Sequence, residues 1–175
     1  MTSATGISTE NLLNDDQVAD FVINGYHIVE PQFPADFHSK VYSELELLPM
    51  NPGDDINKAI PKIDQVYEHP AVAGALASLL GSDYTRAAHR HCHKNHPGTR
   101  SQAWHQDSLN IPTLDDGHGR VSDHVQSVLV MYYPQHVASN MGPTALIPGS
   151  HLFTAAQDRN ASHGNFRDQI VAVVP

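Results

Sequence analysis

Hydrophobic residues in the first half of the chain recur at the three- and four-residue spacing of amphipathic helices. The first apolar face lies between Asn14, whose side chain suits a helix N-cap, and Gly25, a residue type that ends helices in left-handed backbone. A second stripe runs over 33–48, and a third helix is predicted over 70–80 with proline at its first position. Residues 51–62 are rich in Asp, Asn, Pro and Gly, which predicts a loop.

The second half of the chain changes to patterns typical of strands. Residues 84–94 alternate between the two sides of an extended backbone, and residues 125–133 form a nearly continuous apolar run of β-branched and aromatic side chains. Shorter strands are predicted over 26–29, 144–147 and 169–174. Helices that precede a set of antiparallel strands predict the α+β fold class.

No repeat or linker interrupts the sequence, so we expect a single domain over residues 1–175. Residues 8–82 are expected to form a mainly helical layer, and residues 83–175 a β core. A length of 175 residues is sufficient to bury such a core.

The composition excludes several classes of protein. Ten Lys and Arg against nineteen Asp and Glu leave a formal net charge of -9, which argues against binding to nucleic acid or to a polyanionic membrane surface. The single cysteine excludes an internal disulfide and indicates a reducing compartment. The N-terminus lacks the basic and apolar segments of a signal peptide, and no apolar run approaches the roughly 18 residues of a membrane span. We therefore expect a cytoplasmic protein.

Thirteen histidines exceed average usage and suggest a metal site. The segment Trp104–Asp107 reads Trp-His-Gln-Asp, and an extended backbone would place the imidazole of His105 and the carboxylate of Asp107 on the same side. With a distant histidine, such a pair makes the facial triad of non-haem Fe(II) oxygenases. The His-x-Asp tripeptide alone is weak evidence, because chance produces about one in a chain of this composition.

Two further segments flank this motif. The first predicted helix ends in Asn24-Gly25-Tyr26, and the motif is followed by a segment that runs from Gly142 to Pro-Gly-Ser-His at 148–151. With these segments in this order, the chain resembles the phytanoyl-CoA dioxygenase family of Fe(II)/2-oxoglutarate-dependent oxygenases.

The resemblance implies a cupin-like double-stranded β-helix, or jelly roll, with the N-terminal helices packed on one sheet. It also implies that His105 and Asp107 are two of the three iron ligands, that Fe(II) is the metal and that 2-oxoglutarate is the cosubstrate. The implied reaction is the oxidation of a C–H bond in a small-molecule substrate by O₂.

Two positions of the family pattern have no counterpart in the sequence. The family's third ligand is a histidine on a late strand, and an arginine beyond it pairs with the distal carboxylate of 2-oxoglutarate. The strand predicted over 169–174 resembles the one before that histidine, and Pro175 follows it. We therefore expect a C-terminally truncated jelly roll without its last two strands. A non-catalytic or fragmentary jelly-roll binding module stays open as the alternative function.

Other residues near the motif are candidates for the pocket. Trp104, His93 and Arg100 are expected to contact substrate or to line the pocket, with the guanidinium suited to a substrate carboxylate or phosphate. The alternatives are packing for the tryptophan, a place on the sheet surface for the histidine and an exposed loop for the arginine. His151 and His163 could replace the missing iron ligand, although a turn anchor and a solvated loop residue are their simpler interpretations.

The alternation over 84–94 places His89, His91 and His93 on one side and Cys92 on the other. Three imidazoles can bind zinc or nickel, so a zinc-binding domain is a third interpretation. Neighbours on one face of a strand are about 6.6–7 Å apart. Zinc–nitrogen bonds of about 2.0–2.1 Å make convergence of all three on one ion difficult. Cys92 is expected to be a small buried apolar group.

Overall fold

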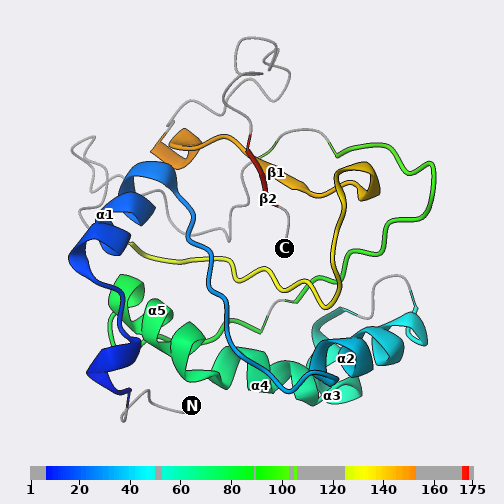
Figure 1. The fold of residues 1–175 in the computed structure, drawn as a ribbon, viewed down its shortest axis with the longest axis horizontal. Coiled ribbons are helices and arrows are strands. Elements are labelled where there is room, and N and C mark those ends of the chain that lie inside the picture. The colour runs from blue at the N-terminus through cyan, green and yellow to red at the C-terminus, as the bar shows by residue number, and fades with distance from the viewer. Residues whose placement is uncertain are drawn as a thin grey trace.

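The computed structural model describes residues 7–49, 53–88, 90–102, 105, 125–152 and 171–173. Its helices are α1 (Asp15–Asn24), α2 (Phe37–Glu46), α3 (Ile56–Ala59), α4 (Lys62–Glu68) and α5 (Pro70–Leu80), and its strands are β1 (Thr144–Leu146) and β2 (Val171–Val173). Short 3-10 helices are η1 (Thr9–Asn11), η2 (Gly53–Asp55), η3 (Ser139–Met141) and η4 (Ser150–Leu152). Figure 1 shows α2 to α5 along one side of the molecule and the β1–β2 pair on the opposite side.

Helix α1 begins and ends where its capping residues predict. The side chain of Asn14 accepts a hydrogen bond from the backbone N–H of Gln17 at 2.9 Å, and the Gln17 side chain accepts one from the Asn14 backbone at 3.0 Å. This capping box satisfies two N–H groups that have no partner within the helix. Gly25 ends the helix with a φ of 82°. The prediction over 70–80 is confirmed equally well by α5.

The prediction of a loop over 51–62 is wrong for the residues of this range that the structure describes. Helix α3 lies inside the range, and α4 begins at its last residue. Ile56, Ile60, Ile63 and Val66 are all buried and lie three or four positions apart. This is a helical stripe. The polar residues between the isoleucines conceal it when the segment is interpreted from its composition.

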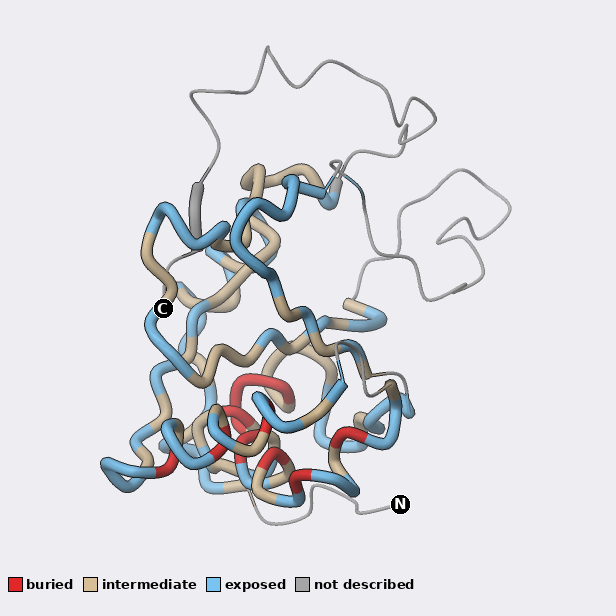
Figure 2. Tube along the Cα trace, turned by 90° about the vertical axis from the view of Figure 1, so that its right-hand side faces the viewer, coloured by how far each residue is buried: buried red, intermediate tan, exposed pale blue. Residues whose placement is uncertain are grey.

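The core lies in the helical layer, where the buried residues gather (Figure 2). One face of α2 packs on α3, α4 and the residues between them through seven buried side chains: Phe37, Val41, Leu45, Ile56, Ile60, Ile63 and Val66. Cys92 and Tyr132, from the second half of the chain, are partly buried against the same cluster. The helical layer therefore holds the two extended segments that contain these residues.

The short strands predicted over 144–147 and 169–174 are confirmed in part. β1 and β2 pair antiparallel, with Thr144 opposite Val173 and Leu146 opposite Val171. This pairing brings the last described residues beside the Gly142–His151 segment.

The prediction of strands over 26–29, 84–94 and 125–133 is wrong for the described residues of these ranges. Their backbone is irregular and lies outside the sheet. The alternation of polar and apolar residues determines which side chains turn inward. A strand also needs the backbone of a neighbouring segment as a hydrogen-bonding partner. The inward and outward sides still alternate over 90–95, without a ladder.

The jelly roll implied by the resemblance is therefore not confirmed. The described residues form mostly helices, with a single two-stranded sheet. None of the helices among them is long and apolar enough to cross a membrane.

Candidate functional site

The Trp-His-Gln-Asp motif is represented in the described part of the chain by His105, whose side chain is exposed. Trp104 and Asp107 lie outside the described residues, as does His163. An exposed imidazole is accessible to a metal ion, and an imidazole with a carboxylate is a donor set that suits iron. The pairing of His105 with Asp107 stays a prediction.

A complete triad is not assembled within the described residues. No group of three or more His, Cys, Asp or Glu side chains that could hold a metal ion occurs among them. Asp107 lies outside these residues, so the third ligand of the predicted pair stays open.

His151 is held at the C-terminal end of α1. Its Nε2 atom lies 3.0 Å from the carbonyl oxygen of Val22, and the backbone N–H of Gly149 donates to the carbonyl of Asn24 at 2.9 Å. A carbonyl oxygen only accepts, so Nε2 of His151 carries the proton in this contact and is not available to a metal. Backbone carbonyls in the last turn of a helix have no partner within the helix. The carbonyls of Val22 and Asn24 find theirs in the Pro-Gly-Ser-His turn. His151 thus makes the contacts of a turn anchor.

Gly25 is required at the point where this turn meets α1. A Cβ atom at position 25 would lie 2.3 Å from Nδ1 of His151, and the φ of 82° disfavours any residue with a side chain. The sequence indicated Gly25 as a helix end. Its second role, making room for an imidazole more than a hundred positions away, depends on the tertiary structure.

The segment around Cys92 follows the predicted alternation of sides. Arg90, Cys92 and Lys94 are partly buried, whereas His91 and His93 are exposed. The ammonium group of Lys94 donates to the carbonyl of Leu48 at 2.7 Å, which ties the segment to the end of α2. Cys92 is half-buried and packs on the core, and burial raises the pKa of its thiol, an effect that Lys94 partly opposes.

Of the other candidate pocket residues, His93 and Arg100 lie at the surface. Their proposed contacts with substrate or cosubstrate stay predictions.

A contact between Tyr132 and His38 was missed in the sequence, where neither residue carried a chemical role. The Tyr132 hydroxyl lies 2.8 Å from Nδ1 of His38, and the His38 ring packs edge-on against Phe33 and Phe37. Burial raises the pKa of Tyr132 to about 12. The only sequence signal was the position of His38 beside the apolar stripe of its helix. This contact fastens the 125–133 segment to α2.

We expect the alkaline titration of the protein to show this burial. The pKa of Tyr132 in the folded state lies above the ordinary value of about 10 for tyrosine. The stabilisation that the neutral, buried hydroxyl contributes is therefore complete below about pH 10. Because the pKa of Tyr132 is raised to about 12, this contribution is lost as the pH rises between the two values. Tyrosinate absorbance, recorded immediately after a pH jump, should contain a component that titrates near pH 12 and is absent in Tyr132→Phe.

Tyr133→Phe is the matched control, because Tyr133 donates instead to the hydroxyl of Thr144. It should keep the component near pH 12. Persistence of that component in Tyr132→Phe would show that another tyrosine is its source.

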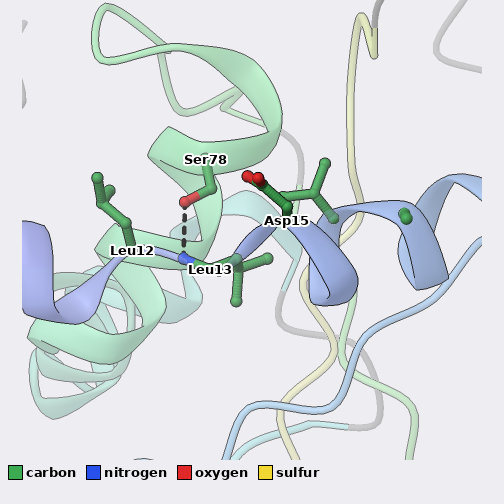
Figure 3. Close-up of a pocket in the computed structure, with 6 residues that line it drawn as sticks. Leu12, Leu13, Asp15 and Ser78 are labelled. Atoms are coloured by element: carbon green, nitrogen blue, oxygen red, sulfur yellow. Dashed lines mark hydrogen bonds between the residues drawn. The ribbon is translucent and has the colours of Figure 1, made fainter.

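A shallow, open depression lies beside α1 (Figure 3). There the backbone N–H of Leu13 donates to the hydroxyl of Ser78 at 2.9 Å, which joins the start of α1 to α5. Its lining residues are Leu12, Leu13, Asp15, Val18, Ala19 and Ser78. With one carboxylate and no imidazole, this lining does not fit a histidine-based metal centre, and none of the residues predicted for the site belongs to it.

Comparison with protein families yields a match. A family model described as phytanoyl-CoA dioxygenase (PhyH) matches residues 9–170 of the 175. The matched range includes the Trp-His-Gln-Asp motif and the Pro-Gly-Ser-His turn. Neither the curated proteins nor the solved structures contain a match to the chain.

Proposed function

Because the chain belongs to the phytanoyl-CoA dioxygenase family, we propose that it is an Fe(II)- and 2-oxoglutarate-dependent oxygenase that oxidises a C–H bond of a small molecule. The family match over 9–170 is the observation that carries this proposal. At the level of the family, dependence on Fe(II) and 2-oxoglutarate is typical. The small-molecule substrate and the use of O₂ follow from the same membership.

His105 and Asp107 are the proposed iron ligands of this chain. The exposure of His105 supports its role, because a ligand must be reachable by metal and substrates. A neutral imidazole and a carboxylate together suit a divalent ion with open positions. Of the two histidines proposed as a replacement for the third ligand, His151 already uses Nε2 in its contact with α1, which favours His163.

Bound Fe(II) would supply the activation of O₂, coupled to the oxidative decarboxylation of 2-oxoglutarate. The chain's own residues would position the reactants and keep water away. Arg100 is proposed to bind a carboxylate or phosphate of the substrate, and Trp104 and His93 to form part of the pocket wall. The contacts of Lys94 and Cys92 with the helical layer support this assignment, because they anchor the segment that leads into the motif.

A binding module without catalysis is the second candidate function. The observation that favours it is that His151, a candidate for the third ligand, is engaged with the carbonyl oxygen of Val22. Such a module would keep the family's shape and bind a small molecule without a working iron centre.

An anaerobic titration of the 175-residue chain with Fe(II) and then 2-oxoglutarate tests the proposal. Chelation of 2-oxoglutarate by the iron produces a visible charge-transfer band, and we expect this band with the native sequence. His105→Ala and Asp107→Ala should each weaken Fe(II) binding by at least about tenfold and remove the band, since even residues that only support ligands affect affinity by about 10–100-fold.

His96→Ala is the matched control, because His96 is exposed in a turn of the same segment and its backbone makes the turn's hydrogen bond. It should keep the band. Circular dichroism checks that every variant retains its helices. Absence of the band from a folded native chain would favour the binding module.

A further inference from the structure

We propose that His91 and His93 form a second metal site, a two-imidazole chelate for a borderline divalent transition-metal ion of the Zn²⁺, Ni²⁺ and Cu²⁺ class. This site is separate from the ligands proposed for iron, His105 and Asp107, and does not depend on the oxygenase assignment.

The packing of the segment turns both imidazoles outward. Cys92, between them, packs against the helical core, and Lys94 reaches inward to the carbonyl of Leu48. The backbone N–H of Arg90 donates to the carboxylate of Asp54 at 2.7 Å. The segment is thus tethered on both sides of the pair, and the side chains of His91 and His93 share the exposed face.

The two rings are closer than an extended backbone by itself dictates. Their centroids lie 4.4 Å apart with planes tilted by 46°, whereas next-but-one residues on a strand are spaced by about 6.6–7 Å. The side chains of His91 and His93 therefore lean toward each other.

This separation of the ring centres is close to what a chelate requires. With metal–nitrogen bonds of about 2.0–2.1 Å, each ring centre lies about 3.2 Å from a shared ion, and angles from square-planar to tetrahedral separate the two centres by about 4.5–5.2 Å. The observed 4.4 Å falls just below that range. Side-chain rotation on the exposed face would bring the two ring centres into that range.

The chemistry of the pair selects the class of metal. Imidazole nitrogen suits Zn²⁺, Ni²⁺ and Cu²⁺ better than Mg²⁺ or Ca²⁺, which prefer oxygen. The proposed site has the two imidazoles as its protein donors among the described residues, where no group of three ligating side chains occurs. Affinity should follow the general order for nitrogen ligands, with Cu²⁺ bound more tightly than Ni²⁺ or Zn²⁺.

Titration calorimetry of the intact chain with Ni²⁺, together with electron paramagnetic resonance of the Cu²⁺ form, tests the pair. His91→Ala and His93→Ala should each weaken Ni²⁺ binding by at least about tenfold, and each should remove one nitrogen from the Cu²⁺ spectrum. Both side chains are exposed, so the variants are expected to fold, which circular dichroism verifies.

His96→Ala is the control for general surface histidine binding, and His105→Ala is the control for the proposed iron site. Neither should change Ni²⁺ affinity at the pair. Equal losses in all four variants, or no loss in His91→Ala and His93→Ala, would overturn the proposal and leave the 4.4 Å contact as ring stacking only. The 2-oxoglutarate band depends on His105 and Asp107, so failure of either site is recognised independently.

Discussion

Replacing Ile60 by alanine is expected to lower the free energy of unfolding by about 2–5 kcal/mol. Ile60 is 1% exposed and lies between α3 and α4, where the face of α2 closes over it. Removing three carbons from this position loses their burial and leaves a cavity, since the surrounding helices relax only partly. Urea denaturation followed by circular dichroism measures the change.

Ile28→Ala is the matched control, because it makes the same chemical change at a residue that is 57% exposed. Its effect should stay within about 0.5 kcal/mol, the usual range for surface substitutions. Equal destabilisation by the two substitutions would contradict the placement of the core in the helical layer.

Replacing Gly74 by alanine is expected to destabilise the protein by about 1–3 kcal/mol, the usual cost of overpacking. Helix propensity alone predicts the opposite, a gain of about 0.8–1.0 kcal/mol in the interior of α5. The added Cβ, however, would lie 1.9 Å from the backbone oxygen of Asn11. The clash is with main chain, so no side-chain rotation removes it, and η1 would have to move away from α5.

Chemical denaturation gives the sign of the Gly74→Ala effect, and limited proteolysis near Leu13 shows whether η1 has been released. Ser78→Ala separates the two contributions of this junction. It removes the hydrogen bond from Leu13 without adding a clash, and should cost about 0.5–1.5 kcal/mol. A Gly74→Ala variant more stable than the native chain would show that η1 does not pack on α5 as described.

Local chemistry explains which helices were predictable. Asn14 and Gly25 mark the ends of α1, and Pro70 the start of α5, through hydrogen bonds and backbone angles confined to neighbouring residues. The stripe through α3 and α4 is equally local. The Asp, Asn, Pro and Gly residues of 51–62 predict a loop, and they obscure the helical spacing of its isoleucines.

The strands were less predictable because they need partners from elsewhere. Residues 84–94 and 125–133 carry the right patterns, yet their described parts join no sheet, whereas Thr144–Leu146 finds Val171–Val173 and pairs. A pattern records the preference of one segment. A ladder requires a second backbone edge, and its position depends on the whole chain.

The same division applies to the candidate sites. The sequence by itself determined the family and its motif, because both depend on residue identity. It also determined that His91 and His93 face away from Cys92, because side chains alternate with the two-residue period of an extended chain. Only the tertiary structure decided that His151 seats on the end of α1 and that Tyr132 meets His38. It also decided that the rings of His91 and His93 approach to 4.4 Å. The first two contacts join residues far apart in sequence, and the third depends on Cys92 and Lys94 packing on a core that other segments build.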